Sequence, residues 1–411
     1  GDGALVKPAI RWGSAVVLRP VQIVVYWLSG LVPRDPRRWA LGCWSGRRFG
    51  DNAGAVFLEA STRPRSNLEV AWITRDRSIR DQLRAVGHRA HLAWSPGGIW
   101  WTVRSGVFVY DSLSKDVNYW LSRRARLVLL RHGVGVKKIE RAIDAQDHRL
   151  WKLFHGSGVQ RAMWRFALPS HCPVPDLVMS CSPTHASQAP WFFGVDHERV
   201  RVTGSPRLDR LATEGPEDRT AIPTVGRAIP TNGPLFLYVP TFREGMTRQR
   251  FQWDVLQEAA ASAGVTIAVK LHYIDAERGV LGLDSLATLP NLRMIDPHVD
   301  LVEIYPHCDG MISDFSSCPF DFVLLDRPVL YYVPDEASFS DSRPLIYELE
   351  DVAVGPLCRD GDELETALAA AVSVDFGVPH EKYVALRERF HTYPQGGAAE
   401  RVIDEIVEEF V

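Results

Sequence analysis

The sequence predicts an α/β protein with two doubly wound domains in tandem. Its 411 residues exceed what one ordinary hydrophobic core needs and suit two cores. Apolar runs typical of buried strands alternate with helix-like runs, which indicates parallel sheets with crossover helices. This alternation stops once, over residues 212–234, where Pro, Gly and charged residues dominate as in an interdomain linker.

The strands of the first domain are expected over residues 39–44, 68–74, 107–110, 126–130, 177–180 and 200–203, with helices near 53–60 and 78–86. Those of the second domain are expected over residues 235–239, 266–271, 292–295, 310–313 and 329–333. The chain is thereby divided into an N-terminal segment over 1–38, an N-terminal domain over 39–220, a C-terminal domain over 221–395 and a C-terminal helix over 396–411.

Composition narrows the class of protein. Hydrophobic residues make up 46% of the chain and charged residues 24%, as in folded globular proteins. The formal net charge of -3 gives no reason to expect binding to nucleic acid. The six cysteines lack metal-type spacing, which favours reduced thiols in a cytosolic compartment. We expect no metal, because the sequence has no clustered carboxylates of the metal-binding kind. We also expect no cofactor.

The N-terminal segment has membrane character. Residues 15–33 are apolar, but Arg19 and Pro20 interrupt them, so neither a bilayer span nor a signal peptide fits well. An amphipathic helix lying in the membrane interface fits better, and a helix packed on the domain surface is the alternative. The basic residues expected to face lipid headgroups are Lys7, Arg11, Arg19, Arg34, Arg37 and Arg38.

One candidate catalytic residue follows a predicted strand of the first domain. Open parallel sheets bind ligands at the carboxyl ends of their strands. His132 comes after the strand over 126–130, and Gly133 and Gly135 permit a tight turn there. A histidine in this place can accept a proton near neutral pH. The alternative is an ordinary packed or solvated loop histidine.

Two strand ends of the second domain carry cations. Lys270 and His272 lie on the same face of their strand end, so both can donate to a phosphate. Thr241 and Arg243 follow the strand over 235–239, where a guanidinium can hold a phosphate through two hydrogen bonds. A solvated lysine and a surface salt bridge are the alternatives.

A third strand end of the second domain offers hydroxyl groups. Asp314 follows a buried strand, and Ser316 and Ser317 open an apolar helix. Serine hydroxyls and free backbone N–H groups at such a point can cradle a diphosphate. Simple capping of the helix uses the same donors and remains the alternative.

Together these segments resemble the CDP-glycerol glycerophosphotransferases, the primases and polymerases of wall teichoic acid and related capsule polymers. The resemblance covers nearly the whole chain after about residue 38. Its motifs occur in the family's order: residues 132–144, 204–209, 240–243, 270–272 and 314–321. The segments SGRRFGDNAGAVFLEA and RERFHTYPQGGAAERVIDEI are similar as well.

The resemblance implies a GT-B fold, two Rossmann-like domains facing across a cleft, with the acceptor on the first domain and CDP-glycerol on the second. It implies transfer of glycerol phosphate to a hydroxyl of a lipid-linked acceptor or growing poly(glycerol phosphate) chain, with release of CMP. The implied partners are CDP-glycerol, a polyprenyl-diphosphate-linked saccharide or polymer, and the membrane surface. The implied location is the cytoplasmic face of the bacterial cell membrane, as a peripheral protein.

The resemblance also implies roles for individual residues. His132 corresponds to the catalytic base, and His272 to the histidine that contacts the diphosphate as CMP leaves. The expected CDP-glycerol site is Thr241, Arg243, Lys270, His272, Asp314, Ser316, Ser317 and Asp321. Asp144, Arg207 and Asp209 are further candidates from the matching motifs.

Other functions stay open at the level of sequence. Ser205, Leu208 and Tyr273 depart from the family's usual residues, which leaves the acceptor and the polyol undecided. A ribitol-phosphate transferase that uses CDP-ribitol and a GT-B glycosyltransferase that uses a nucleotide sugar are the alternative enzymes. A catalytically silent scaffold at the membrane is the alternative of a different class.

Overall fold

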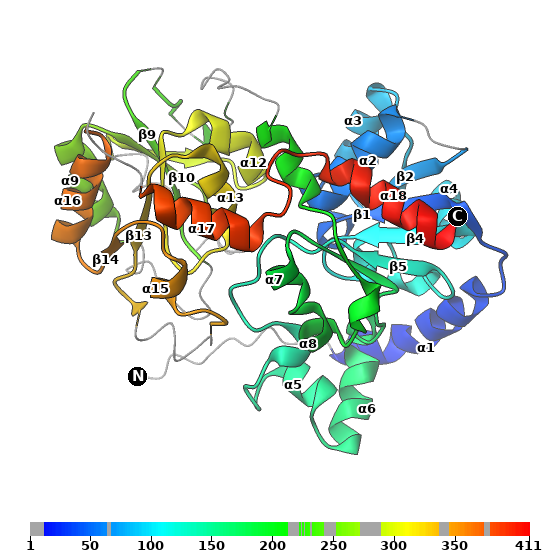
Figure 1. The fold of residues 1–411 in the computed structure, drawn as a ribbon. Helices are drawn as coiled ribbons and strands as arrows, with labels where there is room; N and C mark the ends of the chain where they lie inside the picture. The colour runs from blue at the N-terminus through cyan, green and yellow to red at the C-terminus, as the bar shows by residue number, and fades with distance from the viewer. Residues whose placement is uncertain are drawn as a thin grey trace. The chain divides into compact units, whose positions relative to one another are not determined.

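A computed structural model of the chain describes residues 12–63, 67–212, 222, 224–225, 227–230, 232–241, 252–271, 289–336, 345–373 and 379–411. The chain forms two compact units (Figure 1). We call them the amino-terminal unit, residues 7–133, 138–209 and 390–411, and the carboxyl-terminal unit, residues 1–6, 134–137 and 210–389.

The amino-terminal unit is built on a seven-stranded sheet with strand order β3-β2-β1-β4-β5-β6-β7, in which every pairing is parallel. Its strands are β1 (Asp35–Gly42), β2 (Glu69–Thr74), β3 (Ala90–Leu92), β4 (Ser105–Tyr110), β5 (Arg126–Leu129), β6 (Leu177–Ser180) and β7 (Val200–Val202). The chain leaves β1 toward β3 and then returns to place β4 on the other side of β1. This reversal is a topological switch point, where open α/β sheets bind their ligands.

Helices bury both faces of this sheet. They are α2 (Asp51–Thr62), α3 (Arg77–Ala85), α4 (Pro96–Arg104), α5 (Arg149–Phe154), α6 (Gly158–Ala167), α7 (Pro183–Ala186), α8 (Ala189–Phe193) and α18 (Ala398–Phe410). Alternate residues of β1 enter opposite cores: Trp39 and Leu41 pack with α2 and α18, whereas Ala40 packs in the cluster that contains Trp101 of α4. Burial on both faces explains why these strands are continuous apolar runs.

The C-terminal helix α18 returns to the amino-terminal unit, where it lies beside α2 (Figure 1). Val402, Ile403 and Ile406 are fully or almost fully buried against the same core as Phe57 of α2. The carboxylate of Asp209 accepts hydrogen bonds of 2.8 Å from the backbone N–H groups of Ala398 and Ala399, and so caps the start of α18.

The carboxyl-terminal unit repeats the design with strand order β14-β13-β12-β9-β10-β11-β8. Its strands are β8 (Thr224–Val225), β9 (Leu235–Val239), β10 (Thr266–Val269), β11 (Leu292–Ile295), β12 (Gly310–Ser313), β13 (Val329–Tyr332) and β14 (Leu357–Cys358). All pairings are parallel except β8 with β11. Its helices are α9 (Trp253–Ala263), α12 (Leu301–Ile304), α13 (Cys318–Phe322), α15 (Leu349–Val352), α16 (Gly361–Ala371) and α17 (His380–Phe390).

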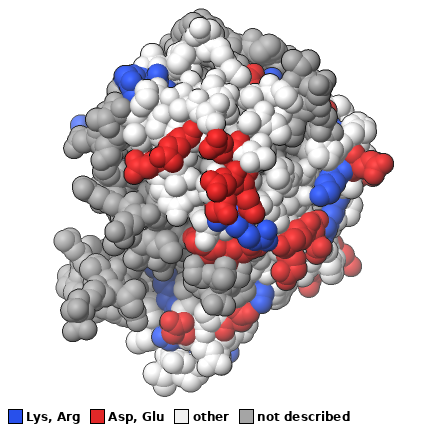
Figure 2. Space-filling view, turned by 90° about the vertical axis from the view of Figure 1, so that its left-hand side faces the viewer, with Lys and Arg blue, Asp and Glu red and all other residues white. Residues whose placement is uncertain are grey.

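The outer side of α16 is acidic. Figure 2 shows Asp and Glu side chains gathered on the face that presents this part of the carboxyl-terminal unit. Arg359 lies among them and bonds to Glu336 at 3.0 Å and Glu350 at 3.4 Å. The negative field of these carboxylates would repel an anionic ligand from this face.

The structure confirms the prediction of two parallel-sheet α/β domains. The strands predicted over 177–180, 235–239, 292–295 and 310–313 agree with β6, β9, β11 and β12 to the residue. The short strands β3, β8 and β14 were not predicted, because two or three residues are too few to show a period. One of them, β8, lies inside the stretch 212–234 that the composition had marked as a linker.

The N-terminal segment forms helix α1 (Trp12–Ser29), which packs on the amino-terminal unit along one side. Tyr26 stacks on Tyr119 with ring centroids 5.1 Å apart, and Arg19 donates to the carbonyl of Ala167. Within the described residues, no helix is long and apolar enough to cross a membrane.

Two arginines of this segment are placed differently from the expectation. Arg34 does not face outward: its guanidinium donates to four backbone carbonyls, those of Thr102, Ser105, Leu121 and Arg123. Arg38 pairs with Glu69 at 2.7 Å. Arg34 directly precedes β1 and Arg38 lies within it, so both are bound within the fold.

Candidate active site

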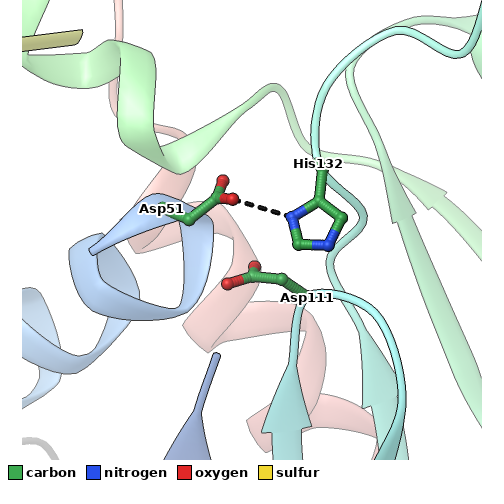
Figure 3. A group of neighbouring side chains, drawn as sticks. All are labelled: Asp51, Asp111 and His132. Atoms are coloured by element: carbon green, nitrogen blue, oxygen red, sulfur yellow. Dashed lines mark hydrogen bonds and ion pairs between the residues drawn. The ribbon is translucent and has the colours of Figure 1, made fainter. Parts of the chain in front are cut away.

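The candidate active site lies at the switch point of the amino-terminal sheet. Asp111 and Ser112 follow directly after β4, and His132 follows β5. Asp51 is the first residue of α2, which follows β1. Adjacent parallel strands end at the same edge, so three separate segments bring their polar side chains together there (Figure 3).

The central contact joins His132 to Asp51. Nδ1 of His132 lies 2.7 Å from Oδ2 of Asp51 (Figure 3). Burial by itself would raise the pKa of Asp51, but the His132 ring and the Arg207 guanidinium, whose Nη1 is 3.6 Å from Oδ1, outweigh burial and hold this pKa well below its usual range. Asp51 is therefore an anion at neutral pH, and Nδ1 is the nitrogen that donates to it. In the neutral ring, the other nitrogen, Nε2, is then the acceptor.

A hydroxyl group already lies at that acceptor. The Ser112 hydroxyl is in hydrogen-bond contact with Nε2 of His132, so Ser112, His132 and Asp51 form a hydroxyl–imidazole–carboxylate series. In such a series the imidazole takes a proton from the hydroxyl, and the carboxylate keeps the ring in the productive tautomer. The indole ring of Trp44 lies 5.0 Å from the imidazole and covers part of it.

The pKa of the second carboxyl group, Asp111, is shifted in the opposite direction. Burial, followed by the nearby charges of Asp51 and Asp116, raises the pKa of Asp111 well above its usual range. Its Oδ1 accepts a hydrogen bond of 3.0 Å from the backbone N–H of Ala53. Asp111 thus keeps its proton beside an ionised Asp51, since two carboxylates this close do not both ionise readily.

A strained turn presents His132. Arg131 has φ +65°, a left-handed conformation that costs a residue with a side chain about 1 to 3 kcal/mol. Its buried guanidinium donates to the carbonyl of His185 at 3.0 Å and to Oε1 of Gln188 at 3.2 Å. These bonds hold the turn, and Gly133 completes it at φ +87° without a penalty.

Asn52 connects this turn to the other segments of the site. The residue is almost completely buried. Its Nδ2 donates to the carbonyl of Arg131 at 2.8 Å, and its Oδ1 accepts from the Ser205 hydroxyl at 3.1 Å and from the backbone N–H of Arg207 at 3.0 Å. One amide therefore fixes His132, Asp51 and the Arg207 loop relative to one another.

The fold assembles a group that the sequence did not show. Asp51, Asp111 and His132 offer ligand atoms within 4.8 Å of one another, so they could hold a metal ion. Asp111 would first have to lose the proton that its environment favours, and His132 would exchange its bond to Asp51 for the metal. The charges of these groups match proton transfer more closely than metal binding.

The three further candidates, Asp144, Arg207 and Asp209, have different surroundings. Arg207 belongs to the site through its contact with Asp51. Asp209 caps α18. Asp144 pairs with Lys138 at 2.6 Å on the surface, a bond that lowers the pKa of Asp144.

In the carboxyl-terminal unit, two predicted residues meet at the switch point between β9 and β12. The backbone N–H of Thr241 donates to the Asp314 carboxylate at 2.9 Å and its hydroxyl at 2.6 Å. Asp314 thus ties the segment after β12 to the segment after β9. Lys270, at the end of neighbouring β10, is buried and its Nζ donates to the carbonyl of Pro297 at 2.7 Å.

The remaining predicted residues of that unit lie near α13 or outside the described residues. The Ser316 hydroxyl contacts Sγ of Cys318 at 3.1 Å, and Ser317 precedes α13 without a side-chain capping bond. Asp321 is buried within α13. Arg243 and His272 fall outside the described residues.

Sequence reasoning missed Asp51, Asn52, Asp111 and Ser112 as site residues. Asp111 and Ser112 directly follow a correctly predicted strand, so the rule that selected His132 also applied to them. Asp51 and Asn52 lie in the segment SGRRFGDNAGAVFLEA, which resembled the family, but nothing in one sequence indicated that this segment contacts His132.

Comparison with known proteins shows similarity to one family over most of the chain. The family model of CDP-Glycerol:Poly(glycerophosphate) glycerophosphotransferase matches residues 25–408. A teichoic acid poly(glycerol phosphate) polymerase of Bacillus spizizenii is 21% identical over 400 residues, 93% of this chain and 95% of that protein. Another, from Bacillus subtilis, is 27% identical over 213 residues, which are 50% of this chain and 28% of that protein.

The fold has solved counterparts. The wall teichoic acid polymerase TagF superposes with a TM-score of 0.73 at 19% identity, over 97% of this chain and 96% of that chain. At this identity the likeness speaks for the fold alone, which is GT-B-like. Because the family model spans nearly the full length of the described fold, the chain belongs to the CDP-glycerol:poly(glycerophosphate) glycerophosphotransferase family.

Proposed function

We propose that this protein transfers glycerol phosphate from CDP-glycerol to a hydroxyl of a lipid-linked acceptor or a growing poly(glycerol phosphate) chain, and releases CMP. The observation that carries the proposal is the imidazole of His132. It is oriented by Asp51 on one side and meets a hydroxyl on the other, at the switch point of a GT-B-like domain. Family membership supplies the donor and the polymer.

The reaction needs a base at Nε2. The acceptor hydroxyl takes the place of the Ser112 hydroxyl, gives its proton to Nε2, and its oxygen attacks the distal phosphorus of CDP-glycerol. A new phosphodiester bond forms as the bond to CMP breaks, and the proton later leaves His132 for solvent. The Asp51 carboxylate stabilises the imidazolium formed in between.

Asp111 supports this step by its neutral state. With Asp111 protonated, Asp51 is the carboxylate next to the imidazole that carries the charge. A second carboxylate near the incoming diphosphate would oppose binding of the donor. The proton on Asp111 removes that repulsion.

The nucleotide is proposed to bind to the carboxyl-terminal unit. Strands β9, β10 and β12 are neighbours, so Thr241, Lys270 and Asp314 end at one edge of its sheet. The donor site there consists of these residues with Arg243, His272, Ser316, Ser317 and Asp321. Positively charged and hydroxyl groups would balance the diphosphate without a divalent cation.

We also propose that α1 attaches the protein to the cytoplasmic membrane surface. Leu18, Val21, Val24, Leu28 and Leu31 recur every three or four residues, and each has more than half of its surface exposed. An exposed apolar row of this kind matches a helix that lies in the interface of a bilayer. A lipid-linked acceptor would be met at that surface.

The direct test is incubation with CDP-glycerol and a synthetic lipid-linked acceptor, followed by mass measurement of the product. His132→Ala should lower kcat by about 10² to 10⁴-fold because the base is lost. His197→Ala, at an exposed histidine of the same unit, is the matched control. Near-normal CMP release by folded His132→Ala would contradict the base, and turnover of CDP-ribitol or a UDP-sugar instead of CDP-glycerol would identify a different donor.

Asp51→Asn should also lower kcat, by roughly 10²-fold or more, with a smaller change in KM. The amide keeps the size of the side chain but can donate to Nδ1, which leaves the proton on Nε2 and blocks the base. Steady-state kinetics of this variant and of Asp196→Asn, an exposed aspartate in a loop, make the comparison. Equal activity of the two variants would mean that Asp51 does not set the tautomer.

Asp111→Asn should change how stability depends on pH. Unfolded Asp111 ionises near pH 4, whereas folded Asp111 keeps its proton to higher pH, so the wild-type fold loses stability as pH rises above about 4. Asparagine does not ionise and still accepts from Ala53. The free energy of unfolding of Asp111→Asn, measured in urea, should therefore exceed that of the wild type by an amount that grows from pH 5 to pH 7.5. The growth should be up to about 1.4 kcal/mol per pH unit. The exposed control Asp147→Asn should differ from the wild type in free energy of unfolding by the same amount at every pH. If the difference for Asp111→Asn is also independent of pH, Asp111 is not a neutral carboxyl group in the folded protein.

A double variant, Val21→Glu with Val24→Glu, should release the protein from anionic liposomes. Each valine loses roughly 1.5 to 3 kcal/mol of burial, so the bound fraction should fall about tenfold or more. Val86→Glu, at a valine exposed after α3, is the control for added charge. Unchanged co-sedimentation of the double variant would reject α1 as the attachment site.

A further inference from the structure

We propose that a small pocket beside Ser112 binds a phosphate group of the acceptor, with Arg141 as its cation. The inference rests on the proposed function, because it names which part of the acceptor chain is recognised. It implies an acceptor that already carries glycerol phosphate next to the attacking hydroxyl.

The pocket lies within the amino-terminal unit and shares a wall with the candidate active site. Its lining includes Ser112, Ser114, Arg141, Phe154 and Phe193. Ser112 is the residue whose hydroxyl contacts Nε2 of His132. A ligand whose hydroxyl replaces that of Ser112 would therefore extend its next group into this pocket.

Arg141 is a cation available to an anion. Its guanidinium lies over the Phe154 ring at 5.1 Å, and a Cβ placed on Gly194 would come within 2.7 Å of it, so the side chain is held between the two. Among the described residues no carboxylate forms an ion pair with it. Glu140, the neighbouring acid in the lining, is instead 3.0 Å from Nδ1 of His171. A held guanidinium without an acidic partner suits a phosphate, which it can bind through two hydrogen bonds.

Ser114 supplies a second, independent indication. The residue is 2% exposed, and its Oγ has no hydrogen-bond partner among the residues that the structure describes. A buried hydroxyl without a partner costs roughly 1 to 3 kcal/mol, so such groups are usually satisfied. A phosphate oxygen in the pocket would accept this hydrogen bond.

The size and chemistry of the pocket favour a phosphodiester over a sugar ring. The space is small, and its polar donors are a guanidinium and serine hydroxyls. In a poly(glycerol phosphate) chain, the terminal hydroxyl and the preceding phosphate are separated by only a few bonds. With such a phosphate in the pocket, the site would favour extending a chain over starting one.

The test compares glycerophosphoglycerol with diglycerol, a neutral ether of similar length, as ligands of the full chain in isothermal titration calorimetry. The wild-type protein should bind glycerophosphoglycerol at least about tenfold more tightly than diglycerol. Arg141→Gln should remove that preference, Arg141→Lys should retain part of it, and the exposed control Arg199→Gln should leave it unchanged. An undiminished preference in Arg141→Gln would overturn the proposal.

Two further measurements separate this proposal from a purely structural role of Ser114 and from binding of the donor in the pocket. Ser114→Ala should weaken binding of glycerophosphoglycerol while thermal stability stays equal or rises, whereas a purely structural hydroxyl would lower stability and leave binding intact. A rise in the dissociation constant of CDP-glycerol in Arg141→Gln, matching the loss for glycerophosphoglycerol, would assign the pocket to the donor and overturn the inference. If the wild-type chain transfers nothing from CDP-glycerol, the proposed function fails, and the calorimetric preference still decides the pocket.

Discussion

The hydrogen bond between Asp51 and His132 is the interaction on which the site depends. It decides which ring nitrogen carries the proton, and so turns a loop histidine into an acceptor aimed at a hydroxyl. The bond exists because β1 and β5 are placed on either side of β4, with their carboxyl ends at one edge. Much of the surrounding structure serves to hold these two side chains in register.

The groups that hold Asp51 and His132 in place are buried polar side chains. Hydrogen bonds and ion pairs compensate for the cost of burying them. Asn52 satisfies three partners from two other segments, and the Arg131 guanidinium bonds to groups at α7 and α8. Asp51 is buried as an anion next to Arg207, whereas Asp111 is buried with its proton. A fold usually gives two adjacent carboxyl groups different roles by placing them in different environments.

The two units use the same geometry for different chemistry. In each, the site residues follow strands that meet at a switch point, β1 and β4 in one and β9 and β12 in the other. The amino-terminal switch point carries a proton acceptor beside a pocket with a cation. The carboxyl-terminal switch point carries a turn tied together by Thr241 and Asp314. In the proposed reaction, the amino-terminal unit activates the acceptor and the carboxyl-terminal unit holds the nucleotide.

The sequence by itself determined the fold class, most strands and the position of His132, because apolar runs and the residues that follow them are local signals. It did not reveal Asp51, Asn52, Asp111 or Ser112 as members of the same site, since the contacts of Ser112 and Asp51 with His132 span 20 and 81 positions along the chain. It also left undecided which side of α1 is exposed and where α18 packs. Only the tertiary structure decided these points, because strand order and helix docking depend on packing between distant segments, and the charge states of the carboxyl groups follow from the burial that this packing creates.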